Sequence, residues 1–264
     1  MAHFKTLVLS DVHLGTQDAK SKELAKFLKH NHARRLILNG DIIDAWHLHH
    51  KAKWKKKDTR VFRRILEMIE KHHTQVIYVR GNHDDFLDKM IPFAFGNIRI
   101  VENYELVSNG RKYFVTHGDI FDVVSSQFTW LARVGDVGYK FLLWLNRRHN
   151  KRRALRGLPY DSVSQKIKNR VKLAVNYISN FEQVMVDYAG KKGYGGVICG
   201  HIHKPENKMI GDIHYLNSGD WVETLSALVE DEHGNWQVIY FDTVMEVADF
   251  EKEEVAFIPA QFSE

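Results

Sequence analysis

Short apolar runs recur along the chain, and each ends in a polar residue beside a turn. Five of them lie at residues 6–9, 36–38, 76–79, 113–115 and 197–199. Runs of this length, bounded by turn residues, are typical of strands that are covered on both faces. Residues 21–30 carry apolar positions at helical spacing, and so does the segment after Asp58 and Thr59, either of which can cap a helix. The opening therefore predicts β-α-β-α-β order with parallel strands and right-handed crossovers.

The alternation of predicted strands and helices ends near residue 97, and several short strands follow. Short strands are expected at residues 98–101, 105–108 and 112–115, with Asn109-Gly110 as a hairpin turn. Residues 121–190 are predicted to be helical, and strands return at 197–199, 213–216, 225–230 and 236–241. The loop after residues 36–38 is expected to hold His47, His49 and His50, followed by a lysine run. The chain is predicted to be an α/β protein with a core of residues 1–120 and 191–245, a helical insertion at 121–190 and an acidic tail at 246–264.

Charge and cysteine content give limited information on binding partners and on the cellular compartment. The formal charge is +5 and the pI is about 9.1, which favours an anionic partner such as a phosphate, nucleic acid or an acidic membrane surface. Simple solubility explains the same charge. Cys199 is the single cysteine, so no disulfide forms within the chain, in keeping with a reducing compartment. No stretch is long and charge-free enough to cross a bilayer, and the first apolar run is too short for a signal peptide. We expect a cytoplasmic protein.

The polar residues that follow the predicted strands are metal-ligand types. In open α/β sheets the carboxyl ends of the strands are where sites form. Two divalent ions held close together need several such ligands and one shared carboxylate, and mixed imidazole, carboxylate and amide ligands suit Mn, Fe or Zn. The candidate ligands are Asp11, His13, Asp41, Asn82, His117, His201 and His203.

These residues form a recognisable series. Asp11-x-His13, Gly40-Asp41-x-x-Asp44, Gly81-Asn82-His83-Asp84, His117-Gly118-Asp119 and Gly200-His201-x-His203 resemble, in order, the motifs of the calcineurin-like metallophosphoesterases. The resemblance implies two packed mixed β-sheets flanked by helices in four layers, with a dinuclear metal site at one edge. It also implies hydrolysis of a phosphoester through attack of a metal-bound hydroxide on phosphorus.

The resemblance assigns a role to each motif residue. One metal takes Asp11, His13, Asp41 and His203, and the other takes Asp41, Asn82, His117 and His201, so that Asp41 bridges them. Mn²⁺ is the expected metal, with Zn²⁺ or Fe²⁺ as alternatives. His83 acts on the leaving oxygen, and Asp84 is expected to hold the His83 ring. Asp44 and Asp119 either orient ligands or simply cap turns.

The insertion suggests a substrate. Residues 121–145 hold more aromatic and aliphatic side chains than one amphipathic face needs, and residues 147–156 are rich in arginine and lysine. With Leu216-Asn217-Ser218-Gly219-Asp220-Trp221, this layout resembles the UDP-2,3-diacylglucosamine pyrophosphatases of lipid A synthesis. The resemblance implies cleavage of a UDP-linked diacylated glucosamine into UMP and an acyl-sugar 1-phosphate, and peripheral contact with an anionic membrane through residues 121–156. The substrate contacts it implies are Asn82, His83, Asp122, Ser164, Lys168, Lys172 and His201.

One departure keeps other hypotheses open. Well-known members of that branch carry arginine at the position of His83, and histidine, unlike arginine, can also donate a proton. A phosphodiesterase, nuclease or nucleotide phosphohydrolase acting on a soluble substrate is therefore an alternative, with nucleic acid as a less favoured partner. A non-enzymatic scaffold would predict damaged ligand positions, and none is damaged here. The apolar insertion is equally compatible with burial against the core or with a dimer contact.

Overall fold

The structure, a computed structural model, describes residues 2–50, 54–124 and 178–242. The chain divides into two compact units, residues 1–119 with 186–264 and residues 120–185. Only residues 120–124 and 178–185 of the second unit are described. Most of the predicted insertion and the whole of the predicted acidic tail therefore lie outside the described residues. No helix in the described ranges is long and apolar enough to span a membrane.

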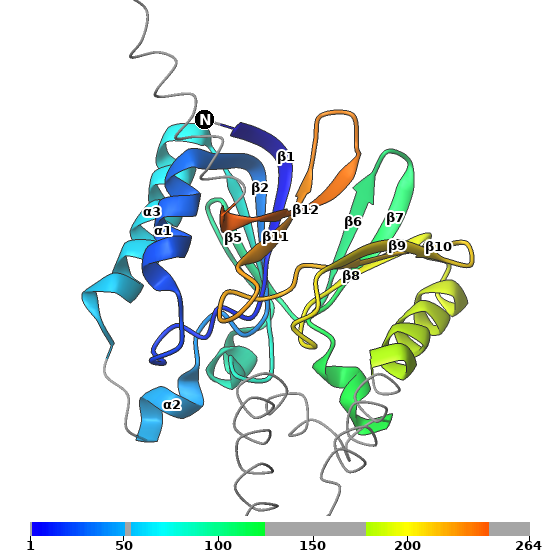
Figure 1. Cartoon of the computed structure of the whole chain (residues 1–264), viewed down its shortest axis with the longest axis horizontal. Coiled ribbons are helices and arrows are strands. Elements are labelled where there is room, and N and C mark those ends of the chain that lie inside the picture. Colours follow the sequence, from blue (N-terminus) through cyan, green and yellow to red (C-terminus); the bar gives the residue numbers. More distant parts are fainter. Residues whose placement is uncertain (1, 51–53, 125–177, 243–264) are drawn as a thin grey trace, which may run out of the picture. The chain divides into compact units, whose positions relative to one another are not determined.

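Two mixed sheets make up the first unit (Figure 1). Their strands are β1 (Ala2–Leu9), β2 (Asn31–Asn39), β3 (Gln75–Val79), β4 (Phe93–Phe95), β5 (Ile98–Val101), β6 (Tyr104–Ser108), β7 (Arg111–Val115), β8 (Gly196–Cys199), β9 (Glu206–Ile210), β10 (Ile213–Asn217), β11 (Ser226–Glu230) and β12 (Trp236–Tyr240). The larger sheet has the order β12-β11-β1-β2-β3-β5-β4, and the smaller has the order β6-β7-β8-β10-β9. β1, β2 and β3 pair in parallel, which confirms the predicted opening.

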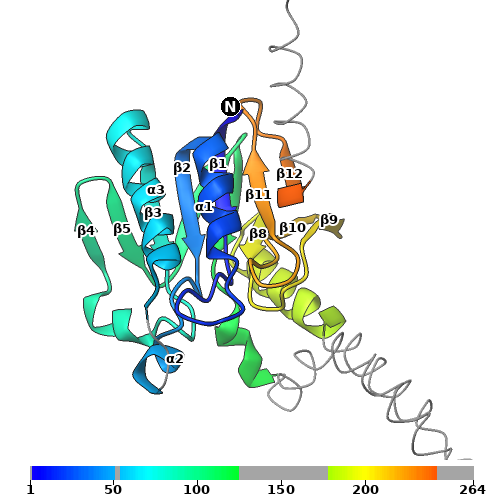
Figure 2. The ribbon, with the colours of Figure 1, turned by 60° about the vertical axis from the view of Figure 1, so that its left-hand side comes forward.

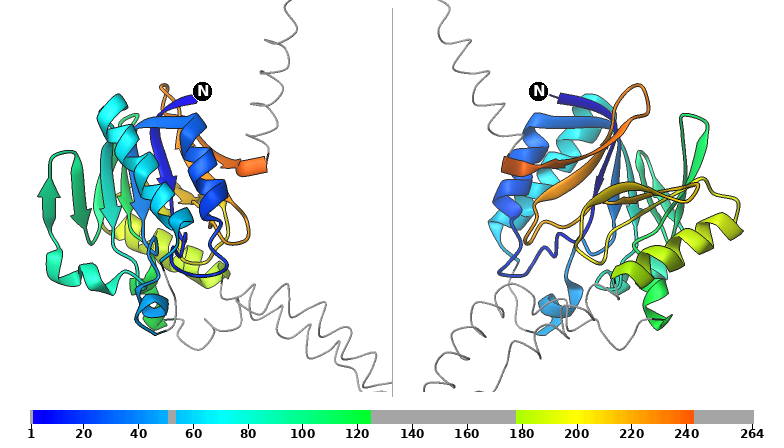
Figure 3. Two further views of the ribbon diagram at one scale, coloured as in Figure 1. Left: turned by 90° about the vertical axis from the view of Figure 1, so that its left-hand side faces the viewer. Right: turned by 45° about the vertical axis from the view of Figure 1, so that its right-hand side comes forward.

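The central strands β1, β2 and β3 of the larger sheet are buried on both faces at their carboxyl-terminal ends, as their apolar runs predict. Along β1, Leu7 and Leu9 belong to the core shared with α1 (Ser21–His30) and α3 (Lys56–His72). Val8, on the other face, packs in the core between the sheets together with Ile198 and Leu216. The period of two thus separates a helix-facing core from an inter-sheet core. α1 and α3 lie side by side across the larger sheet (Figures 2 and 3).

Outside the two sheets, helical residues 186–191 of the first unit pack on the smaller sheet. Helical backbone runs through residues 178–191, and within the first unit the ring of Tyr188 packs against Phe114 of β7 with centroids 5.1 Å apart. Two short 3₁₀ helices, η1 (Asp85–Met90) and η2 (Asp119–Val124), follow candidate ligand segments. Two mixed sheets with flanking helices are the predicted fold class.

Two local predictions about helices are wrong. α2 (Ala45–His50) forms where a loop was expected, because the Asp44 carboxylate accepts a hydrogen bond from the His47 N–H at 2.9 Å and caps the helix. α3 begins at Lys56, ahead of both predicted caps. Asp58 acts from inside the first turn, where its carboxylate accepts hydrogen bonds from the Lys55 N–H and the Ser21 hydroxyl.

The predicted hairpin turn is present in the structure, whereas two edge strands were not predicted from the sequence. Asn109 and Gly110 have φ of 49° and 75°, the left-handed pair that the predicted two-residue turn requires. β4 and β9 were not predicted, and both are edge strands. β4 has only three residues, all of them exposed, and β9 alternates half-buried and exposed positions, so neither is a strand buried on both faces.

A group of imidazoles lies at the start of β1 and β2. The rings of His32 and His72 stack with centroids 4.1 Å apart. Burial lowers the pKa of His32, and the charges of His72, His3, the chain's amino terminus and His30 lower it further. We call His3, His30, His32 and His72 the histidine cluster.

Candidate metal centre

The candidate ligands follow the carboxyl ends of five strands. Asp11 and His13 follow β1, Asp41 follows β2, and Asn82 follows β3 in the larger sheet. In the smaller sheet the ligand segments after β7 and β8 leave two parallel strands. Parallel strands place their carboxyl ends at one edge, and Figure 1 shows the loops from both sheets meeting at one end of the sandwich.

Asp41 lies at the centre of the converging side chains. Its Oδ2 is 3.4 Å from Nε2 of His117, 3.8 Å from Nε2 of His83 and 3.9 Å from Nε2 of His13. Asp11 Oδ1 lies 3.2 Å from Nε2 of His203. Two ligand atoms bound at 2.0–2.2 Å to one ion are about 3–3.5 Å apart, so the separations between Asp41 and His117 and between Asp11 and His203 fit atoms that share a cation.

Three buried ligand atoms are without a hydrogen-bond partner among the described residues. They are Asp11 Oδ1, Asn82 Oδ1 and His117 Nε2. Leaving such an atom unsatisfied costs about 1–3 kcal/mol, more for a charged group, and a divalent cation would satisfy all three. Triads of ligand atoms lie within 4.8 Å of one another, among them Asp11 with His13 and His203. The residues present therefore fit divalent metal ions.

The electrostatics match a cation site. Burial raises the pKa of Asp11, but His203 and His117 outweigh burial and hold that pKa well below its ordinary value. For Asp41, burial is likewise outweighed by His117, and the pKa falls to about 2. Burial lowers the pKa of His203, yet the Asp11 carboxylate raises it to about 8. Carboxylates that stay ionised while buried attract positive charge to this edge.

Strained backbone marks the ligands themselves. Asp11, His13, Asp41, His201 and His203 all have positive φ, between 50° and 68°. Such conformations cost of order 1–3 kcal/mol each in residues other than glycine, and they persist where the surroundings fix them. Hydrogen bonds between the loops do so here, such as Asp11 N–H to the Gly40 carbonyl at 3.1 Å and His201 N–H to Asp11 Oδ2 at 2.9 Å. This strain has no sequence signal.

Glycines let the ligand loops approach closely. A Cβ added at Gly40 would collide with the His117 ring, and one at Gly81 would collide with the Asp41 backbone and carboxylate. A Cβ at Gly200 would collide with Asp11. Glycine beside a ligand in these motifs is therefore required by close packing as well as by the turn.

The ring of His83 is held by a different carboxylate from the one expected. Asp44 Oδ2 lies 3.2 Å from His83 Nδ1 and 3.4 Å from His13 Nδ1. Asp84 instead accepts hydrogen bonds from backbone N–H groups. In the structure the Asp44 carboxylate lies beside the rings of both His83 and the candidate ligand His13, in the position expected for Asp84.

Asp84 joins two ligand loops. Its carboxylate accepts from the N–H groups of Ile42 at 3.3 Å, Ile43 at 3.0 Å and Gly81 at 3.3 Å, and from the Tyr78 hydroxyl at 2.8 Å. Burial, together with the charge of Asp41, raises the pKa of Asp84 to about 6. Asp84 thus fixes the Asp41 loop against the Asn82 loop.

Asp119 pairs with the guanidinium group of Arg80. Its Oδ2 accepts from Arg80 at 2.7 Å, and Arg80 also bonds Asp88 at 2.8 Å. Burial lowers the pKa of His117, but Asp41 and Asp11 raise it well above the ordinary value, and Asp119 adds to that rise.

Sequence reasoning missed several supporting residues. The Asn39 carbonyl is 2.9 Å from Nδ1 of His117, which directs Nε2 of that ring toward Asp41. Asn217 donates to the Gly200 carbonyl at 2.9 Å and so supports the His201 loop. Asn39 is the last residue of β2, and nothing in the neighbouring sequence indicates that its carbonyl holds the ring of a metal ligand. Asn217 lies in the stretch 216–221 that contributes to the family resemblance, and this resemblance could have indicated that the residue supports the site.

The remaining predicted substrate contacts are not brought together by the described structure. Ser164, Lys168 and Lys172 lie outside the described residues, and Asp122 is placed only as part of η2. The ring of His201 lies 5.1 Å from that of His117, within the candidate centre.

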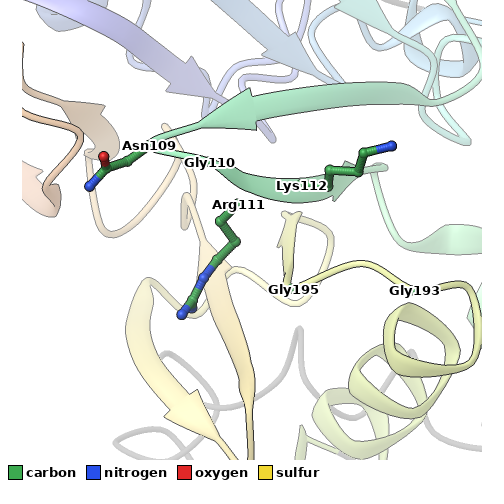
Figure 4. Close-up of a pocket in the computed structure, with 6 residues that line it drawn as sticks. All are labelled: Asn109, Gly110, Arg111, Lys112, Gly193 and Gly195. Carbon is green, nitrogen blue, oxygen red and sulfur yellow. The ribbon is translucent and has the colours of Figure 1, made fainter.

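A surface hollow lies away from these residues, at the opposite end of β7 from His117. It is lined by Asn109, Gly110, Arg111, Lys112, Gly193 and Gly195 (Figure 4). Arg111 and Lys112 point in different directions there, and Lys112 pairs with Glu105 at 3.4 Å. The hollow holds none of the candidate ligands.

Comparison with known proteins agrees with this geometry. Residues 4–205 match the calcineurin-like phosphoesterase family. The chain is 23% identical over 233 residues to a UDP-2,3-diacylglucosamine hydrolase of Shewanella loihica, covering 84% of this chain and 91% of that one. Similar solved structures include the phosphoesterase Yfce from E. coli, with TM-score 0.45, 17% identity and 90% and 93% of the two chains covered. A novel archaeal phosphodiesterase has TM-score 0.40, 12% identity and coverage of 89% and 98%. Because the family match spans well over half of its length, the chain belongs to the calcineurin-like phosphoesterases.

Proposed function

We propose that this phosphoesterase cleaves the pyrophosphate of a UDP-linked diacylated glucosamine, releasing UMP and an acyl-sugar 1-phosphate. The observation that supports hydrolysis is the convergence of buried carboxylate and imidazole atoms on Asp41, beside three ligand atoms that lack a hydrogen-bond partner among the described residues. The lipid part is supported by the likeness to the Shewanella hydrolase, which extends over most of both chains.

Divalent cations fit the centre. In this proposal Asp11, His13, Asp41 and His203 hold one ion, while Asp41, Asn82, His117 and His201 hold the other. Mn²⁺ is the first metal to test, with Zn²⁺ and Fe²⁺ next. When bound, such ions supply Lewis acidity and lower the pKa of water.

The chain's own groups position the reaction. His83 turns Nδ1 toward Asp44 at 3.2 Å, which leaves Nε2 facing the ligand cluster, 3.8 Å from Asp41. From there Nε2 can donate a proton to an oxygen that leaves phosphorus. Asp44 keeps the ring in that orientation and stabilises its protonated form.

His83 also favours a second candidate function. Proton donation matters most for leaving groups that are poorer than a nucleotide or sugar phosphate. The placement of His83 against the cluster therefore supports hydrolysis of a soluble phosphodiester, as an alternative to the lipid pyrophosphate.

The proposed substrate also implies a cellular location for the protein. A diacylated substrate resides in a membrane, so we place the protein in the cytoplasm at the inner membrane face, with residues 121–156 in contact with anionic lipid.

Turnover decides between the two functions. Metal-stripped protein is reloaded with Mn²⁺ and given UDP-2,3-diacylglucosamine or an aryl phosphodiester. UMP release by the wild type and by the exposed control Asp212→Ala, but not by Asp41→Ala, is the expected result. Cleavage of the diester alone would remove the lipid substrate and keep the phosphoesterase. Hydrolysis of neither compound would contradict both functions.

A further inference from the structure

An exposed indole stands beside the candidate centre. Trp46 is 54% exposed, and its ring centroid lies 5.1 Å from that of His83, with the two planes inclined by 40°. Its Nε1 donates to Asp85 Oδ2 at 3.3 Å. The indole is therefore accessible to a ligand that binds beside His83.

The indole extends a row of rings that begins in the ligand cluster. The ring of His203 lies 5.7 Å from that of His13, and the ring of His13 lies 4.8 Å from that of His83. Trp46 is the next ring outward. A phosphate at the cluster whose substituent leaves on the side of His83 therefore carries that substituent over the indole.

The backbone beneath Trp46 is fixed to the same loops as the ligands. The first turn of α2 is capped by Asp44, which accepts from the His47 N–H, and the Ala45 N–H donates to the His83 carbonyl at 3.2 Å. The indole is thereby positioned before any ligand arrives. A preorganised surface of this kind loses little entropy when it binds a rigid group.

We propose that Trp46 is a stacking platform for a nucleobase attached to the substrate phosphate, and that Asp85 accepts a hydrogen bond from a ring N–H at its edge. The inference rests on the proposed function, in which that base is the uracil of the UDP group. An acyl chain suits this spot poorly, because the indole N–H is hydrogen-bonded to the exposed carboxylate of Asp85, which makes that edge of the ring polar. Base stacking on an aromatic side chain contributes about 1–3 kcal/mol.

The test compares two phosphates that differ by the base. Calorimetry on the Zn²⁺-loaded protein measures the Kd of UMP and of ribose 5-phosphate. The wild type should bind UMP about tenfold more tightly, a ratio that matches about 1.4 kcal/mol. Trp46→Ala should abolish the preference, and Trp46→Phe should retain most of it. Equal melting temperatures confirm that both variants are folded.

Trp54 provides the matched control. It is also exposed, but its indole donates to Thr59 at 2.9 Å and packs near Phe62 of α3. Trp54→Ala should therefore keep the preference for UMP. A wild type that binds the two phosphates equally, or a Trp46→Ala variant that keeps the preference, would overturn the inference.

The outcome is separable from that of the proposed function. A UMP preference that depends on Trp46, in a protein that leaves UDP-2,3-diacylglucosamine intact, supports the stacking platform and contradicts the lipid substrate. Cleavage of the lipid with the same KM in the wild type and in Trp46→Ala, together with an unchanged UMP preference, supports the function and overturns the platform.

Discussion

Replacing Gly40 by alanine tests how tightly the glycine turn is packed against the centre. Gly40 has φ of 81°, and an added Cβ would collide with the His117 ring. Gly96 offers a matched control, because its φ is 54° and a Cβ there meets nothing within 4 Å. Gly81 separates the two effects, since its φ is not in the left-handed region while its Cβ would collide with Asp41.

The expected costs follow from these differences. Left-handed backbone costs a residue other than glycine about 1–2 kcal/mol, and the lower entropy of the unfolded chain returns about 0.4–1 kcal/mol. Gly96→Ala should therefore lower the free energy of unfolding by about 1 kcal/mol. Overpacking costs about 1–3 kcal/mol, so after the same return from the unfolded chain Gly81→Ala should cost about 0.5–2.5 kcal/mol. Gly40→Ala adds the overpacking cost to the cost at Gly96 and should lose about 2–4 kcal/mol.

Two assays measure the effects of the three glycine substitutions. Urea unfolding of the metal-free proteins gives the free energies, and chelator competition gives the metal affinity. Gly40→Ala and Gly81→Ala should both weaken metal binding, because they displace His117 or Asp41, while Gly96→Ala should leave it unchanged. If Gly40→Ala and Gly96→Ala lost the same stability and bound metal equally well, the packing argument would be refuted.

Three further changes probe the surroundings of the centre. Asp44→Asn should lower metal affinity about 10–100-fold in chelator competition, as loss of a ligand-orienting carboxylate does; unchanged affinity would limit Asp44 to capping α2. Tyr78→Phe removes the hydroxyl that bonds Asp84 and should lower the free energy of unfolding by about 1.5–3 kcal/mol in urea; no loss would show that this bond contributes nothing. Burial and the histidine cluster lower the pKa of His32, so its contribution to stability is complete above its ordinary value of 6.5 and is lost as the pH falls below it. His32→Gln should flatten the decline in melting temperature between pH 7.5 and 5, and an equally steep decline would contradict that account.

The local pattern of apolar and polar residues predicts most of the central strands. Residues 36–38 and 76–79 were predicted as strands because an apolar run bounded by glycine and polar residues is a short-range signal. Once those strands are parallel, their carboxyl ends must meet, so Asp41 and Asn82 are brought to one edge by topology alone. The edge strands β4 and β9 give weaker signals, because β4 has only three residues and β9 alternates half-buried and exposed positions.

The parts that sequence did not predict depend on contacts between distant loops. Asp44 and Asp84 occupy equivalent-looking positions in their motifs, and only the approach of the two loops decides which carboxylate meets the His83 ring. The positive φ of Asp11 is likewise fixed by a hydrogen bond to Gly40, which lies 29 residues along the chain. The short helix α2 was missed because its histidines and the lysine run after it resemble a solvated loop.

The central claim is that the strand ends hold two divalent cations that share Asp41. Anomalous diffraction from crystals grown with Mn²⁺ tests it directly. The account predicts two strong peaks per chain, both bonded to Asp41, one beside His203 and the other beside His117, and their loss in Asp41→Ala. A protein that shows no peak at these residues, or a single peak that survives the substitution, would contradict it.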